Sequence, residues 1–107
     1  MAIKYKNAKV DLTTADATAV LTPSNATTAI INSILVSEDS GNADTIDLTI
    51  TDTDSAVFSL FKVKAVGANT TVELLTKPLV LAESEILKAE AATANRLHVV
   101  ASYMEIS

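Results

Sequence analysis

The chain has 107 residues, a length that fits one folded domain rather than two. It contains no Cys, which excludes disulfides, thiolate metal sites and cysteine catalysis. Its formal net charge of −5 repels phosphate backbones, so we expect no nucleic-acid partner. No apolar run is long enough for a membrane span or a signal peptide, so no membrane partner is expected either.

Charge is distributed unevenly along the chain. The first nine residues carry the lysines Lys4, Lys6 and Lys9 and no acid, whereas residues 10–61 carry acids and no Lys or Arg. An acidic, solvated surface explains this distribution. The more specific alternative is a basic N-terminal arm, residues 1–10, that contacts an acidic surface of a neighbouring subunit. An ordinary frayed terminus is the simpler reading of the same residues.

Turn-forming residues recur at short intervals, which is typical of a β-sandwich or barrel. They lie at 22–25, 39–42, 52–55, 67–69, 77–78 and 93–95. The Thr-rich and apolar runs between them have strand length. The shorter strands are predicted at Ala8–Leu12, Thr18–Thr22, Thr71–Leu75 and Leu79–Leu81.

The first long strand is predicted at Thr28–Ser37, and it is apolar on both faces. Period-two alternation puts Ile30, Ile34 and Val36 on one face and Ile31 and Leu35 on the other. A strand of this kind is usually central or covered by a partner.

The next strand, Thr45–Thr51, alternates cleanly, with Ile46, Leu48 and Ile50 on the face that we expect to be buried. Ala56–Val63 is again apolar on both faces: its alternation sets Val57, Phe61 and Val63 against Phe58 and Leu60.

The last strand is predicted at Leu97–Ile106. Leu97, Val99 and Tyr103 share one face. The other face is lined by His98, Val100, Met104 and Ile106.

The segment 82–95 is ambiguous between helix and strand. It is rich in helix formers, but its only large apolar residues are Ile86 and Leu87, so a helix there buries little. We therefore predict a strand at Glu85–Ala91 and leave the helix as the alternative.

These elements predict a single all-β domain over residues 1–107. Its expected architecture is an antiparallel β-sandwich, jelly-roll-like, with about eight strands.

The residues needed for catalysis are not assembled by any motif. The one histidine, His98, lies within a predicted strand, where a structural or interface role is expected. Two glycines are too few for a nucleophile elbow or a phosphate-binding loop. We therefore predict a protein that is not an enzyme, with no catalytic, cofactor-binding or metal-binding residue.

Acidic residues cluster at two turns. Residues 39–44 (DSGNAD) superficially resemble a calcium loop but lack the EF-hand spacing, and turn-forming side chains explain them equally well. Asp52 and Asp54 lie at the far end of the same strand, so the two groups cannot form one site within the hairpin. A glycosidase pair is not excluded by composition, but nothing places two carboxylates across a cleft.

Much of the chain resembles small β-sandwich structural proteins of tailed bacteriophages, notably marine ones. Residues 24–37 (SNATTAIINSILVS) match a Thr-rich approach to a strand with the pattern Ile-x-x-Ile-x-Val. Similar stretches follow at 67–75 (GANTTVELL), 78–81 (PLVL) and 96–106 (RLHVVASYMEI). One departure is Ser84-Glu85, where such proteins often carry Gly-Asp before the penultimate strand.

The resemblance implies a virion structural protein, made in the host cytoplasm and forming homo-oligomers. A capsid decoration or cement protein is the expected role, with a neck or tail accessory protein as the alternative. Its partners would be other virion proteins and copies of itself. A carbohydrate- or receptor-binding sandwich is a second alternative of a different class.

Candidate subunit-contact residues lie in the N-terminal arm and the last strand. They are Lys4, Tyr5, Lys6, Lys9 and Tyr103. The predicted strands at 28–37 and 97–106 carry a second apolar face, part of which we expect to contact a subunit.

Overall fold

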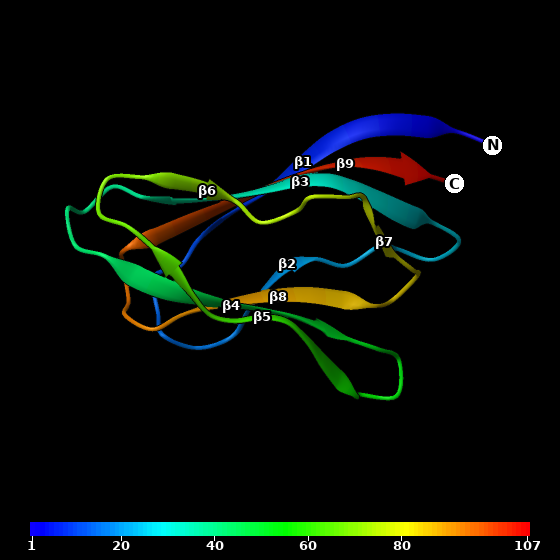
Figure 1. The fold of residues 1–107 in the computed structure, drawn as a ribbon. Coiled ribbons are helices and arrows are strands. Elements are labelled where there is room, and N and C mark those ends of the chain that lie inside the picture. The colour runs from blue at the N-terminus through cyan, green and yellow to red at the C-terminus, as the bar shows by residue number, and fades with distance from the viewer.

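The computed structural model describes residues 1–107 as two antiparallel β-sheets packed face to face, without a helix (Figure 1). The five-stranded sheet contains β1 (Ile3–Asp11), β3 (Thr28–Glu38), β6 (Thr71–Glu73), β7 (Leu79–Leu81) and β9 (Leu97–Ile106). The four-stranded sheet contains β2 (Thr18–Leu21), β4 (Asp44–Thr51), β5 (Val57–Val66) and β8 (Ile86–Ala91). No helix capable of crossing a membrane is present.

The strands form a nested set of antiparallel pairs. The five-stranded sheet has the order β1-β9-β3-β6, with β7 also on β3, and the other sheet has the order β2-β8-β4-β5. Because β6 and β7 pair with successive parts of β3, they act as one interrupted strand. Each strand of the first half thus pairs with its counterpart in the second half, which is the topology of a jelly roll. The predicted fold class is confirmed.

The core lies between the sheets and is almost entirely aliphatic. Its largest fully buried apolar side chains come from both layers: Leu12, Ile31, Ile34, Ile46, Leu48, Leu81, Leu87 and Leu97. Burying each Leu or Ile stabilises the fold by roughly 1.5–3 kcal/mol. The inward positions of β4 and β9 agree with their predicted alternation, since Ile46, Leu48 and Val99 are fully buried.

The ambiguous segment is a strand. β8 lies between β2 and β4, and Leu87, Ala89 and Ala91 point into the core. Pairing on both sides satisfies its backbone groups, so tertiary context overrides the helix propensity of its alanines and lysine. The prediction of a strand at Glu85–Ala91 is confirmed, with β8 beginning one residue later.

A bulge in β3 changes which residues face the core. The register against β9 shifts between Ile31 and Ser33, so one residue is inserted and the alternation changes phase. Ile31 and Ile34 are therefore both fully buried, and Ile30 faces outward. The prediction that Ile30 shares a face with Ile34 and Val36 is wrong for this reason.

Strand β5 is an irregular edge strand. Its register against β4 shifts twice, and Val63 has a positive φ of 52°. The carboxylate of Asp47 accepts a hydrogen bond from the Val63 N–H at 2.7 Å, which supports this irregular backbone. Phe61 packs against the core, whereas Val57 and Val63 are each 63% exposed, so the predicted shared face of these three residues is wrong.

The N-terminal residues form a regular strand of their own sheet. β1 begins at Ile3, five residues before the predicted start, because β9 extends to Ile106 and pairs with it throughout. The residues predicted as an arm, 1–10, thus belong to the edge of the five-stranded sheet. Contact of this edge with a neighbouring subunit stays a prediction.

Candidate interaction surface

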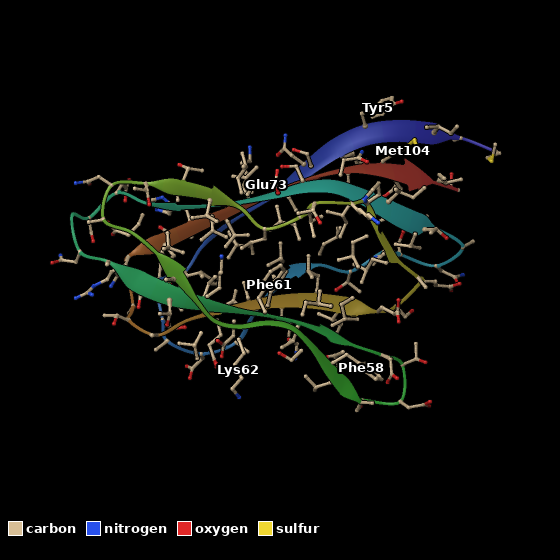
Figure 2. All side chains as sticks on the ribbon, viewed as in Figure 1. Tyr5, Phe58, Phe61, Lys62, Glu73 and Met104 are labelled. Atoms are coloured by element: carbon tan, nitrogen blue, oxygen red, sulfur yellow. The ribbon has the colours of Figure 1, made fainter.

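The outer face of the five-stranded sheet carries a row of apolar side chains at the end where both termini lie. Strand register places Tyr5 beside Met104, Met104 beside Ile30, and Ile30 beside Val80. Directly paired residues project from the same face of a sheet, so the row crosses four strands. Figure 2 shows Tyr5 and Met104 at this end, with Tyr5 projecting away from the sandwich.

A second apolar pair extends the row toward the chain ends, because Ile3 lies beside Ile106. We call the six residues of these two rows the terminal patch: Ile3, Tyr5, Ile30, Val80, Met104 and Ile106. Tyr5 is 81%, Val80 58% and Ile3 50% exposed. Exposed apolar side chains that gather on one face in this way are typical of a functional contact.

The terminal patch has a polar border, and the central strands of the opposite sheet are polar on their outer face. The next row along the outer face is Asn7, Ser102 and Ser33. The outer positions of β4 and β8 pair Asp47 with Glu90 and Thr49 with Lys88. The outer face of the five-stranded sheet is therefore apolar near the termini, whereas the outer face of β4 and β8 is polar. The exposed apolar residues of the four-stranded sheet lie on its edge strand β5: Val57, Phe58 and Val63.

The predicted lysines surround the patch on β1. Lys4 and Lys6 lie on the inward side of the strand but are exposed, whereas Ala8 and Val10 farther along pack against the core. The Lys6 Nζ lies 3.1 Å from Glu105 Oε1 on β9. Lys9 projects from the outer face beside Val100. Tyr5, Lys4, Lys6 and Lys9 are thus accessible for contacts, as a subunit-contact role requires.

Tyr103 does not belong to this surface. Its side chain points between the sheets and is only 8% exposed, so it is part of the core. This corrects its inclusion among the contact residues. The outward neighbours Met104 and Ile106 take that place, and the predicted alternation of β9 already put them on the face opposite Tyr103.

The histidine lies at the other end of the outer face. His98 Nε2 is 3.3 Å from Asp11 Oδ1, and His98 Nδ1 is 3.8 Å from Asp39 Oδ2. These contacts link β9 to the end of β1 and to the loop after β3. The arrangement ties a loop to the sheet, consistent with the structural role expected of His98.

The loop that includes residues 39–44, which superficially resemble a calcium loop, is organised by the carboxylate of Glu38. Glu38 is buried and accepts hydrogen bonds from the N–H groups of Ser40 at 2.9 Å, Gly41 at 3.0 Å and Asn69 at 3.1 Å. The Ser40 hydroxyl also donates to it and is the main cause that lowers the pKa of Glu38 to about 2; together with the backbone donors it outweighs the opposing effect of burial. Glu38 thus joins the β3–β4 loop to the β5–β6 loop.

Asp44, at the other end of the same loop, is also held by a backbone donor. Its carboxylate accepts a hydrogen bond from the Thr93 N–H at 3.1 Å. No three His, Cys, Asp or Glu side chains stand together as a set of metal ligands. The carboxylates of this region therefore organise loops.

Comparison with known proteins adds no family. No family model matches the chain, and no curated protein matches it.

Sequence reasoning did not assign Ile3, Ile30 and Val80 to the terminal patch. Ile3 lay outside the predicted strand, and Ile30 was assigned by an alternation that the bulge breaks. Val80 sits in a three-residue strand that is too short to show a periodicity. The only sequence signal for Val80 was its place between Leu79 and Leu81, in a short apolar run directly after Pro78.

Proposed function

We propose that this protein is a non-enzymatic structural protein of a tailed-bacteriophage virion, a capsid decoration or cement protein that stabilises the particle through subunit contacts. The observation that carries the proposal is the terminal patch, an exposed apolar surface that crosses four strands of one sheet. The resemblance of the sequence to phage sandwich proteins supplies the setting. The jelly-roll fold agrees with that resemblance without selecting among its roles.

The physical role of a cement protein suits this surface. A patch of six residues is small beside the roughly 20–30 residues that each partner contributes to a standard interface, so one contact alone binds weakly. Repeated copies on a particle convert weak contacts into strong attachment, because each bound neighbour raises the effective concentration of the next contact. The rigid aliphatic core keeps the patch preorganised, which lowers the entropic cost of each contact.

Quantitative mass spectrometry of purified particles tests the proposal. A decoration protein is expected at hundreds of copies per particle, and a neck or tail protein, the alternative, at a few to tens. Complete absence from particles would overturn both roles.

A patch variant tests the surface itself. The double substitution of Tyr5→Ser and Val80→Ser is expected to abolish binding to particles that lack the protein, because it removes the two most exposed side chains of the terminal patch. The matched control is Thr49→Ser on the polar outer face of β4, which is expected to bind normally. Equal binding of both variants, with unchanged circular dichroism, would refute the role of the patch. Saturable glycan-array binding that Tyr5→Ser abolishes would instead support the carbohydrate-binding alternative.

A further inference from the structure

The sandwich has four sheet edges, and only one is long and regular. β6 and β7 have three residues each, β2 has four residues and a register shift, and β5 has two shifts. Short strands and bulges are the usual means of preventing a further strand from pairing. β1 has neither, since its nine residues pair with β9 in one unbroken register.

The outward hydrogen-bonding groups of β1 follow from its register. Ala2 and Ser107 exchange two backbone hydrogen bonds of 2.9 and 3.0 Å, and the Leu12 N–H donates to the Leu97 carbonyl at 3.0 Å. Because bonded and non-bonded pairs alternate in an antiparallel ladder, the even-numbered residues of β1 bond to β9. The N–H and C=O groups of Ile3, Tyr5, Asn7 and Lys9 therefore face the free edge, which we call the β1 edge.

The side chains beside the β1 edge define the chemistry of a strand that could pair there. On the outer face, Ile3 and Tyr5 offer apolar contacts. On the inward face, Lys4 and Lys6 offer positive charge, and only Lys6 has an ion-pair partner in the structure. A complementary strand thus carries apolar residues on one face and carboxylates on the other.

The molecule already contains one strand of this composition against β1. The end of β9 places Met104 and Ile106 beside Tyr5 and Ile3, and it places Glu105 against Lys6 and opposite Lys4. The side chains of β1 project above and below the sheet, so those that contact β9 also border the free edge. A second copy of β1 is a poor occupant, because Lys4 and Lys6 of the two copies would lie side by side on the same face of the sheet.

We propose that the β1 edge binds an extended segment of a partner protein as an additional strand, and that acidic and apolar residues alternate in this segment. Main-chain hydrogen bonds to Ile3, Tyr5, Asn7 and Lys9 supply affinity, and the lysines select an acidic partner. The inference goes beyond the virion role and does not rest on it, because it uses the free backbone groups and the lysines of β1.

Peptide titrations test this inference. The probe is a fluorescent peptide of the length of β1 in which Val and Glu alternate, and the control peptides alternate Val and Lys or hold the same Val and Glu residues in two blocks. By fluorescence anisotropy, the alternating Val/Glu peptide is expected to bind at least about tenfold more tightly than either control. This preference over the Lys peptide is expected to shrink as salt is raised.

Variants of β1 localise the binding. Asn7→Pro removes an N–H that faces the free edge and leaves the ladder to β9 intact, so peptide binding is expected to disappear while the melting temperature changes little. The pair Lys4→Glu and Lys6→Glu is expected to reverse the preference toward the Val/Lys peptide. The pair Lys62→Glu and Lys64→Glu, the same charge change on the β5 edge, is the matched control and leaves the preference unchanged.

Three results would overturn the inference. Equal affinity for the Val/Glu and Val/Lys peptides would remove the charge selection. Amide chemical-shift changes on β5 or β2 instead of β1, or no binding of the Val/Glu peptide at about 1 mM, would remove the site. Should Asn7→Pro fail to fold, the Lys4/Lys6 pair and its control, the Lys62/Lys64 pair, still decide.

Discussion

The carboxylate of Glu73 accepts a hydrogen bond of 2.8 Å from the backbone N–H of Ile34, directly after the bulge in β3. The same carboxylate accepts from the Leu75 N–H at 3.1 Å and from the Ser33 hydroxyl. Burial raises the pKa of Glu73, but these hydrogen bonds outweigh it and hold the pKa below its usual range. Glu73 thus fixes the point at which the side chains of β3 change phase, which decides that Ile34 enters the core.

Replacing Glu73 by Gln is therefore expected to destabilise the protein. The variant keeps one acceptor oxygen but loses the charge, and an exposed side chain limits the effect to about 1 kcal/mol, or roughly 4–8 °C in melting temperature. Thermal denaturation followed by circular dichroism measures this change. Glu83→Gln, at an exposed acid in the loop between β7 and β8, is the matched control. Equal melting temperatures for the two variants would contradict the structural role of Glu73.

Acid is expected to weaken the fold through Glu38. Because the folded-state pKa, about 2, lies below the ordinary value of 4.5, Glu38 contributes stability fully above about pH 4.5 and loses it as the pH falls toward 2. Glu38→Gln should have a lower melting temperature than the wild type at pH about 7 and approach it near pH 2. Melting temperatures recorded across this range test the prediction. Parallel curves for the two proteins would show that Glu38 does not titrate in this way.

Replacing each of the two tyrosines by alanine is expected to change the stability of the protein by very different amounts. Tyr103→Ala leaves a cavity in the core and should cost roughly 3–5 kcal/mol, as for other buried aromatic side chains. Tyr5→Ala removes a side chain that is 81% exposed and should change stability by no more than about 0.5 kcal/mol. Urea denaturation of the isolated protein measures both. A large loss for Tyr5→Ala would mean that its side chain packs within the monomer.

Truncation of β1 separates its two halves. Deleting residues 1–6 removes the part of β1 that extends past the core and should leave a folded protein of lower melting temperature. Deleting residues 1–11 also removes Ala8 and Val10 and exposes the edge of β9, so we expect aggregation. Size-exclusion chromatography with light scattering distinguishes the two results. A well-folded monomer after the longer deletion would show that β1 is dispensable for the sandwich.

Regular alternation made much of the fold predictable from the sequence. β4 and β9 each keep one unbroken set of inward residues, so Ile46, Leu48 and Val99 could be assigned to the core directly. The strand at β8 was predictable because a helix there had too few large apolar residues to bury. In each case the local pattern and the tertiary environment favour the same structure.

The candidate surface was harder to predict, because it depends on long-range pairing. The bulge that turns Ile30 outward is held by Glu73, which lies 39 residues after its partner Ile34 in the sequence. The irregularity of β5 depends in the same way on Asp47. Tyr5 could be named from its place in a basic segment, but its neighbours Met104, Ile30 and Val80 come from three other strands. The sequence of any one segment therefore cannot predict this row of apolar side chains.

The reciprocal hydrogen bonds between Ala2 and Ser107 have a practical consequence for engineering. Any tag fused at either end emerges beside Ile3 and Ile106 and would sterically shield the terminal patch. Cargo for surface display is better inserted in the loop between β1 and β2, which follows Asp11; this residue pairs with His98 at the opposite end of β9 from Ile106. Joining the two ends by a short linker, and opening the chain at that loop, should give a circularly permuted protein whose new termini lie away from the terminal patch.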